Sequence, residues 1–385
     1  MTHILIDSDW TEHRLTTGSL HLKSATGATG QSTDFFRLAE RINPKRAFLF
    51  VSTVLGRHIP VAPNVHRAAL QRLAAKVSDQ LLDGPVFVMG YAETAVGLGA
   101  GVFQELRRTY PGRAMGYQAT TRFEPSARDV WFRIEEPHSH ASSHAILKPK
   151  IGVLHQGPGS TLVLVDDETT TGTTFCNLAA RLYETGVRFD RVVLATLTDW
   201  SEGSAADGVS GAIPGAEVAA VSLFDGAWRW EQDTTQDRLP QLPGSIEAEC
   251  PAWRPTGEAP LEAARFGIAG AAADTMNAEL AAQLFSEVGL DALPCDARIL
   301  VLGSGEHVWD PFLFAETIAE SRPETRFAAT TRSPILLGEA IEKKIAFGDH
   351  YGLGVALLDA LGTFVVVDQN ANVVRFGGIK AEVAA

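Results

Sequence analysis

Two adjacent carboxylates, Asp166 and Asp167, stand between an apolar run and a stretch that is rich in threonine. The stretch consists of Thr169, Thr170, Thr171, Gly172, Thr173 and Thr174. If it leads into a helix, the N–H groups at the helix start and the threonine hydroxyls can hold a phosphate, and Gly172 lets the backbone approach it closely. The carboxylates can accept hydrogen bonds from the hydroxyls of a sugar. The pattern predicts a pocket for a phosphorylated sugar, with a plain helix cap at Asp167 or Thr170 as the alternative.

Strand-like and helix-like segments alternate around this stretch. Apolar runs at 161–165 and 191–197 predict strands on either side of a helix from about 173 to 186, and the run at 85–90 predicts an earlier strand. A helix behind an Asn64 cap and another that begins near residue 95 complete the pattern. This alternation predicts an α/β fold with a parallel sheet. The two acids would lie at its carboxyl edge, where open α/β sheets bind ligands.

A proline-rich segment divides the chain. Residues 239–260 contain five prolines and little periodicity, which is typical of a linker, and a helix, strand, helix, strand pattern follows them. We therefore expect a first domain over residues 1–238, a linker over 239–264, and a second, smaller α/β domain over 265–385.

The bulk composition limits the classes of function. A net charge of -13 repels nucleic acid, so a polyanionic ligand needs a local site of backbone amides, a few cations or a metal. The sequence shows no basic leader before a long apolar run, and no apolar stretch of membrane-spanning length. Its cysteines, Cys176, Cys250 and Cys295, are widely spaced, which fits a reducing compartment. We expect a soluble cytoplasmic protein that binds neither nucleic acid nor membranes, and leave open whether it forms a homodimer.

A known family shares the motif around the acids. The segment 162–174 reads LVLVDDETTTGTT and resembles the phosphoribosyl pyrophosphate (PRPP) motif of type I phosphoribosyltransferases. The resemblance implies that Asp166 and Asp167 hold the ribose hydroxyls and that residues 169–174 hold the 5-phosphate. Glu168 departs from the motif, because an aliphatic residue is usual there, and the departure argues against ordinary purine or orotate salvage.

A second motif resembles a domain that accompanies a divergent branch of this family. The segment 329–335 reads ATTRSPI and contains Arg332 and Ser333. It resembles the signature of the TRSP domain, which follows a phosphoribosyltransferase domain in proteins associated with tellurite-resistance gene clusters. Arg332 and Ser333 follow a strand-like run and can grip a carboxylate or a phosphate.

The resemblance also implies a loop for pyrophosphate after an early strand. Its residues are Gly90, Tyr91, Ala92, Glu93 and Thr94, and the amides of Tyr91 to Thr94 can face a ligand before the next helix begins. A strand-to-helix turn with small residues is the alternative. Arg122 and Lys148 flank the next long loop and are candidates to meet the pyrophosphate, or else ordinary surface charges.

In this family a flexible loop between the second and third core strands closes over PRPP, and residues 120–147 take that place. The loop contains His138, His140 and His144, to which we assign proton transfer or contact with the substrate. A zinc site made by the histidines and a solvated loop without function are the alternatives.

Two further groups have less specific signals. Arg57 and His58 follow an apolar strand, and the resemblance makes them candidates for the acceptor side, with an exposed turn as the alternative. In the second domain a strand-to-helix crossing either binds an anion or makes a tight turn; its residues are Gly303, Ser304, Gly305 and Glu306.

The resemblance implies an enzyme that transfers the 5-phosphoribosyl group of PRPP to a nitrogenous acceptor with loss of pyrophosphate, or runs the reverse from a ribonucleoside 5-monophosphate. We expect Mg2+ to assist and to be held mainly through the ligand, with no firm protein ligand. Asp166 and Asp167 would orient the ribose and stabilise positive charge at its reacting carbon. A non-catalytic protein that senses PRPP or a nucleotide is the alternative. The sequence does not identify the acceptor.

Overall fold

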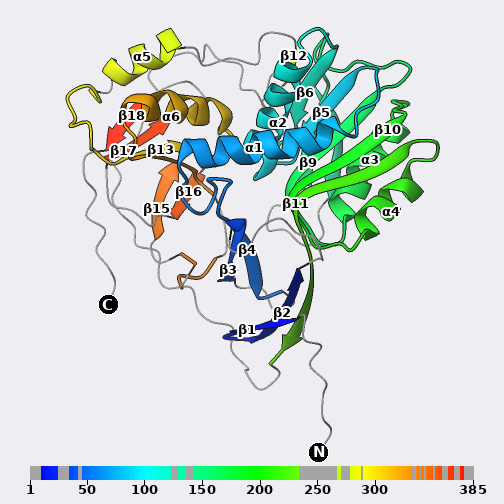
Figure 1. Ribbon diagram of the computed structural model, residues 1–385, viewed down its shortest axis with the longest axis horizontal. Coiled ribbons are helices and arrows are strands. Elements are labelled where there is room, and N and C mark those ends of the chain that lie inside the picture. The colour runs from blue at the N-terminus through cyan, green and yellow to red at the C-terminus, as the bar shows by residue number, and fades with distance from the viewer. Residues whose placement is uncertain are drawn as a thin grey trace, which may run out of the picture.

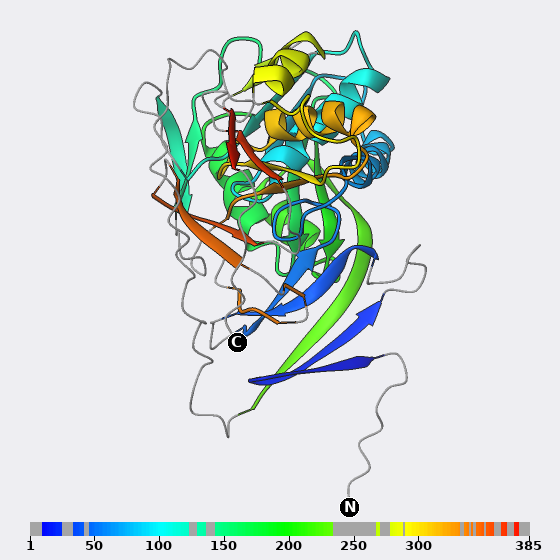
Figure 2. The same cartoon turned by 90° about the vertical axis from the view of Figure 1, so that its left-hand side faces the viewer.

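The computed structural model places two α/β bodies side by side, with helix α1 (Pro63–Ser78) running between them (Figures 1 and 2). It describes residues 10–24, 34–41, 46–122, 129–135, 143–233, 267–269, 278–287, 289–331, 335–338, 340–341, 344–349, 352–357, 363–367 and 373–376.

Parallel strands form the centre of the first body. Their spatial order is β6 (Met115–Ala119), β5 (Val86–Gly90), β9 (Thr161–Thr169), β10 (Arg191–Asp199) and the first half of β11 (Glu217–Gln232). Helices α1 and α2 (Ala95–Thr109) pack together on one face, and α3 (Thr173–Glu184) and α4 (Ser204–Ala212) pack together on the other (Figure 1). Because helices cover both faces, the central strands have continuous apolar runs, at 86–89 in β5, 162–165 in β9 and 192–195 in β10.

The strand order reverses direction between β5 and β9. The chain goes outward from β5 to β6 on one side, and then returns to start β9, β10 and β11 on the other side. Such a switch point leaves a crevice at the carboxyl edge of the sheet, because the loops after the two central strands diverge there. The fold therefore places the loops after β5 and β9 at the position where an open α/β sheet binds ligands.

The N-terminal strands extend the first body beyond the parallel core. Strands β1 (Thr11–Leu15) and β2 (Gly18–Ser24) form a hairpin, and β2 pairs with the second half of β11, which projects from the core (Figure 2). A second hairpin consists of β3 (Phe36–Glu40) and β4 (Phe48–Ser52). The ring of Phe50 stacks on Trp200 at 4.1 Å, so aromatic packing holds this hairpin against the end of β10.

The second body has its own small parallel sheet. Its strand order is β14 (Thr325–Ala329), β13 (Ile299–Gly303), β17 (Thr363–Val367) and β18 (Val373–Phe376), of which β18 is antiparallel. Helices α5 (Ala278–Glu287) and α6 (Trp309–Ser321) belong to this body, together with a hairpin of β15 (Lys344–Asp349) and β16 (Gly352–Leu357). Strand β12 (Ile268–Ala269) instead pairs with β6, at the edge of the first sheet.

Backbone pairing joins the two bodies. The N–H groups of Val61 and Phe327 each donate to the carbonyl of the other residue, at 2.9 and 2.8 Å, and the N–H of Ala329 donates to the carbonyl of Gly56 at 2.8 Å. Val61 of the first body therefore forms an isolated bridge to β14 of the second, and Gly56 adds one more backbone hydrogen bond. These backbone hydrogen bonds set the position of Gly56 and Val61 against β14.

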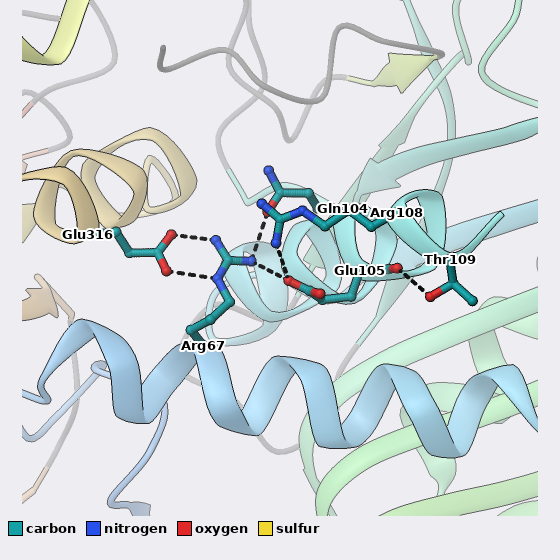
Figure 3. A network of polar contacts seen from close by, with 6 residues as sticks. All are labelled: Arg67, Gln104, Glu105, Arg108, Thr109 and Glu316. Carbon is teal, nitrogen blue, oxygen red and sulfur yellow. Dashed lines mark hydrogen bonds and ion pairs between the residues drawn. The ribbon is translucent and has the colours of Figure 1, made fainter. Parts of the chain in front are cut away.

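An ion-pair network lies on another part of the same junction. Arg67 on α1 forms a two-pronged pair with Glu316 on α6, and its third nitrogen donates to Gln104 and Glu105 on α2 (Figure 3). Arg67 thus links three helices from both bodies.

The expected α/β class and parallel sheet are confirmed, but one local expectation needs correction. Helix α1 starts at Pro63 after Ala62, not behind an Asn64 cap, because proline lacks the N–H that the first helical position cannot use. The expected linker at 239–264 lies outside the described residues. No helix in the described part of the chain is both long and apolar enough to cross a membrane.

The buried His66 predicts sensitivity of the fold to acid. Its ring packs against Phe312 of α6 at 4.6 Å, and burial lowers its pKa to about 4, although a bond to the Val54 carbonyl acts the other way. An unfolded histidine has a pKa of about 6.5, so the unfolded chain gains a proton that the fold excludes as pH falls from about 6.5 to about 4. The free energy of unfolding should therefore fall by about 2 kcal/mol between pH 7 and pH 5 because of His66.

Urea unfolding at the two pH values measures this loss, with His66→Phe as the comparison. Phenylalanine stays neutral and keeps the aromatic packing, so the variant should lose less stability than the parent on acidification. Equal losses in both proteins would mean that His66 does not carry the effect.

Candidate functional site

The loops after β5 and β9 emerge side by side at the carboxyl edge of the first sheet. Gly90 and Val165 are the last paired residues of the two strands, and the N–H of Tyr91 still donates to the Val165 carbonyl at 3.1 Å. Beyond this point β9 continues to pair with β10. The loops after β5 and β9 face each other beside the part of β9 that no longer pairs with β5, after Val165.

The acidic pair lies within β9 and not after it, because the strand runs on to Thr169. Asp166 and Asp167 are half-buried and, as successive strand residues, point to opposite faces. Asp167 accepts a hydrogen bond from the Thr94 hydroxyl at 2.8 Å, and Asp166 accepts one from the N–H of Asp167 at 2.9 Å. Asp167 is therefore held directly against the loop that follows β5.

The threonine-rich stretch makes the turn from β9 into α3. Gly172 stands immediately before the helix with φ at 73°, and a Cβ there would lie 2.4 Å from the Cα of Ala205 on α4. Thr171 and Thr173 are exposed, and their hydroxyls lie 2.9 Å apart. No side chain caps α3, so the alternative of a helix cap at Asp167 or Thr170 is wrong. Thr171 and Thr173 therefore stand exposed at the start of α3, where the helix dipole favours an anion.

The unusual acid Glu168 turns away from this edge toward the N-terminal strands. Its carboxylate accepts a hydrogen bond from Arg46 at 2.8 Å, and both side chains are mostly buried. Burial raises the pKa of Glu168, whereas the Arg46 guanidinium acts in the opposite direction. Burial and the neighbouring Arg46 lower the pKa of Arg41 to about 10. Glu168 thus serves as the counter-charge for two crowded arginines, and it links β9 to the hairpin of β3 and β4.

Only part of the loop after β5 is free to meet a ligand. The N–H of Tyr91 is used by Val165, and that of Ala92 donates to the Thr120 hydroxyl at 2.9 Å. Among the described residues this leaves the amides of Glu93 and Thr94, which narrows the expected set of four. The bond between Ala92 and Glu93 is a cis peptide. The hydroxyl of Tyr91 donates to the Thr174 carbonyl at 3.2 Å and so ties this loop to the threonine turn.

Glu93 lies between two arginines. It forms an ion pair with Arg57, and its other oxygen is 4.0 Å from Arg122. Arg57 is 2% exposed and His58 is 9% exposed, so the alternative of an exposed turn is wrong. Burial, and then the charge of Arg57, lower the pKa of His58 to about 3, which leaves it neutral at physiological pH. The structure places Arg57 beside the loop after β5.

The long segment after β6 contains a hairpin of β7 (Val130–Glu135) and β8 (Ser143–Leu147). His144 is fully buried in β8, 2.9 Å from the Thr120 hydroxyl and 3.5 Å from Arg122, so its expected place in a polar loop is wrong. His138 and His140 lie outside the described residues. Lys148 is exposed after the end of β8, and its N–H donates to the Asp129 carbonyl at 2.9 Å at the start of the same hairpin.

The crossing after β13 reaches the same edge from the second body. Gly303 ends β13, and Glu306 accepts hydrogen bonds from the Thr121 hydroxyl at 2.6 Å and from the N–H of Arg122 at 2.7 Å. The Gly305 carbonyl accepts from Arg57 at 2.6 Å. Ser304 is buried within this turn, whereas Arg332 and Ser333 lie outside the described residues.

No cluster of three or more histidine, cysteine or acidic side chains that could hold a metal occurs among the described residues. A cavity of about 130 Å³ lies at the opposite edge of the first sheet, near Phe189 and Gly215, and contains none of the residues above.

Several contacts at this edge and beside it have no signal in the sequence. Arg46 and Glu168 are 122 residues apart, and Thr121 and Glu306 are 185 residues apart. Neither pair belongs to one periodic segment or one motif. Glu306 stands in the strand-to-helix crossing that the sequence predicts, but its partners depend on how the two bodies dock.

Comparison with known families gives two matches that cover most of the chain. Residues 35–227 match the family PRTase_2, described as phosphoribosyl transferase. Residues 262–357 match the TRSP domain, described as C-terminal to PRTase_2. A search of curated proteins found no match.

Solved structures resemble the chain at low sequence identity. Adenine phosphoribosyltransferase from Thermoanaerobacter pseudethanolicus is 18% identical, with 49% of this chain and 96% of that chain covered and a TM-score of 0.33. The Trypanosoma brucei adenine enzyme, solved with AMP, pyrophosphate and ribose-5-phosphate, is 12% identical over 52% and 82%, with a TM-score of 0.34. Orotate phosphoribosyltransferase from Mycobacterium tuberculosis, solved with PRPP, is 17% identical over 42% and 76%, with a TM-score of 0.25.

Proposed function

The chain belongs to the PRTase_2 family of phosphoribosyl transferases, with a TRSP domain after the family region, and from this membership we propose that it transfers the 5-phosphoribosyl group of PRPP to or from a nitrogenous acceptor with exchange of pyrophosphate. The observation that best supports this proposal is the pairing of two anion-binding loops at one switch point. The Thr94 hydroxyl reaches Asp167, and the Tyr91 hydroxyl reaches the Thr174 carbonyl. The acids therefore lie between two loops, and in this proposal each loop binds one phosphorylated end of PRPP.

Each part of the edge has a distinct role in this proposal. The start of α3 and the hydroxyls of Thr171 and Thr173 bind the 5-phosphate. Asp166 and Asp167 orient the ribose hydroxyls, and their charge stabilises the positive charge that develops on the ribose carbon. The amides of Glu93 and Thr94 bind the pyrophosphate end, where Arg122 supplies positive charge.

The residues present fit a magnesium ion that is held mainly by the ligand. Mg2+ commonly binds through one or two carboxylates together with phosphate oxygens, and Asp166 and Asp167 are oxygen donors at the edge where PRPP would lie. When bound, the ion would neutralise charge on the departing pyrophosphate. The net charge of -13 makes such neutralisation important for a polyanionic ligand.

We also propose the division into domains 1–238 and 265–385. Strand β12 at 268–269 returns to the edge of the first sheet, so the second domain would begin with a contact to the first. The widely spaced cysteines support a cytoplasmic location as part of the same proposal.

The proposed function predicts magnesium-dependent binding and turnover of PRPP. Calorimetric titration of the full chain with PRPP should show binding in the presence of Mg2+ that EDTA weakens by about tenfold or more, because charge repulsion then goes uncompensated. Release of pyrophosphate in the presence of a panel of nitrogenous bases reports turnover and identifies the acceptor.

Absence of PRPP binding with Mg2+ would refute the proposed function. Binding without pyrophosphate release for any base would point to a sensor of PRPP. Equal affinity with and without EDTA would remove the metal and leave the rest of the site intact.

A further inference from the structure

The turn after β13 is a rigid element of the second body. Ser304 and His307 form an antiparallel bridge, and the N–H of His307 donates to the Ser304 carbonyl at 2.9 Å. The N–H of Gly305 donates to the Thr330 hydroxyl at 2.8 Å, which anchors the turn to the end of β14. The turn therefore has a defined position relative to its own sheet, and it presents Gly305 and Glu306 to the first body.

Glu306 is buried at the junction and contacts the first body with both carboxylate oxygens. Its side chain is 1% exposed; one oxygen accepts from the Thr121 hydroxyl at 2.6 Å and the other from the N–H of Arg122 at 2.7 Å. Removing a carboxylate from water is costly unless hydrogen bonds compensate for it. The carboxylate thus holds the backbone at the exit of β6 in one place.

The same turn also holds Arg57, the arginine that forms the ion pair with Glu93. The Gly305 carbonyl accepts from one Arg57 nitrogen at 2.6 Å, while another nitrogen of Arg57 forms the ion pair with Glu93. Arg122, whose backbone Glu306 holds, approaches Glu93 from the other side at 4.0 Å. Two consecutive residues of the second body therefore control both cations that flank the loop after β5.

Docking of the two bodies does not depend on this turn alone. The backbone pairing of Val61 with Phe327 already joins them at another point. The ion pair of Arg67 with Glu316 joins them at a third (Figure 3). A buried carboxylate adds little net stability, so docking alone does not account for Glu306 at this place.

We propose that Glu306 is a positioning residue for the pyrophosphate side of the site, so that the second body completes the PRPP site of the first; this inference rests on the proposed function. Glu306 holds the segment of Arg122 so that its guanidinium faces the Glu93 loop, and the Gly305 carbonyl does the same for Arg57. The TRSP domain then acts on the reaction through these two arginines and needs no ligand of its own.

Variants at Glu306 test the inference, with Glu316→Gln as a matched control. Both glutamates belong to the second body and bind across the junction, but Glu316 contacts Arg67 on α1, away from the Glu93 loop. Glu306→Gln keeps the size and one carbonyl acceptor, and loses the other acceptor and the charge. We expect it to weaken PRPP binding about tenfold in calorimetry with Mg2+, and Glu306→Ala to weaken it further. Glu316→Gln should leave the affinity within about twofold.

Hydrogen exchange at the Arg122 amide provides a readout that does not depend on PRPP. Exchange should become faster in both Glu306 variants, because that N–H loses its charged acceptor, and should stay unchanged in Glu316→Gln. Thermal melting shows whether domain docking has changed in all three variants. If Glu306→Ala does not fold, the near-isosteric Glu306→Gln carries the test.

The outcomes separate the two proposals. Failure of the parent chain to bind PRPP refutes the proposed function, and this inference with it. Binding by the parent that both Glu306 variants leave unchanged refutes the inference alone. Equal loss of affinity in Glu306→Gln and Glu316→Gln also refutes it, because the effect would then come from weakened docking.

Discussion

Replacement of both Asp166 and Asp167 by asparagine is expected to weaken PRPP binding by at least about tenfold. Each charge-assisted hydrogen bond from a ribose hydroxyl to a carboxylate contributes about 1.5 to 3 kcal/mol, and asparagine offers only a weaker neutral acceptor. The difference from a neutral bond is about 1 to 1.5 kcal/mol, so two replacements lose about 2 to 3 kcal/mol. A loss of about 1.4 kcal/mol corresponds to a tenfold change. Calorimetric titration with PRPP and Mg2+ measures the loss directly.

The fold should tolerate this double variant. Both side chains are half-buried at the edge of the sheet, and an asparagine oxygen can still accept from the Thr94 hydroxyl and from the backbone N–H that Asp166 now binds. Asp190→Asn is a suitable control, because Asp190 also accepts a backbone N–H, from Gly159 at 2.6 Å, but stands before β10 at the opposite edge. A double variant that melts like the parent and binds PRPP with the affinity of the control would contradict the sugar-phosphate site.

The single variants assign separate roles to the two acids. Asp167 faces Thr94 and the loop after β5, whereas Asp166 shares its face of β9 with Glu168. Asp167→Asn should therefore weaken pyrophosphate binding as well as PRPP binding, and Asp166→Asn should weaken PRPP binding alone. The contrast would show whether the acids act as one unit or on different parts of the ligand.

Contiguous features of the site could be predicted from the sequence. The acids, the threonines and Gly172 are neighbours in the chain, and the change from an apolar strand to a helix is visible in the local pattern. The switch point follows from the order of strands and helices once the sheet is parallel. For the same reason, the position of Gly90 to Thr94 opposite the acids could be expected without knowledge of any side-chain contact.

Contacts that depend on docking could not be predicted. Arg57 follows a strand in a segment that looks like an exposed turn, but that segment pairs with β14 of the second body and is buried. His144 lies in a polar sequence, yet β8 carries it back against Thr120. In both cases the polar residue is buried because a distant element covers it, and local hydrophobic periodicity contains no information about that element.

Gly172→Ala is expected to damage both the fold and the phosphate loop. The backbone of Gly172 has a φ of 73°, which costs an alanine about 1 kcal/mol or more, and the added Cβ would lie 2.4 Å from the Cα of Ala205. Because that neighbour is backbone, the turn or α4 must move, at a further cost of about 1 to 3 kcal/mol. A shift of about 1 Å in a positioning element can cost about a hundredfold in function. PRPP affinity and urea unfolding measure the two effects.

Gly186→Ala separates the local clash from the backbone conformation. Gly186 follows the other end of α3 and also has a positive φ, of 89°, but no atom lies within 4 Å of the place that a Cβ would take. The Gly186→Ala variant should lose about 1 kcal/mol of unfolding free energy, because only the left-handed backbone conformation is strained. Its PRPP affinity should stay that of the parent. If Gly172→Ala lost no more stability than Gly186→Ala and bound PRPP as tightly, α4 would not confine the turn. The threonine loop would then not owe its phosphate-binding shape to the close approach of Gly172 and Ala205.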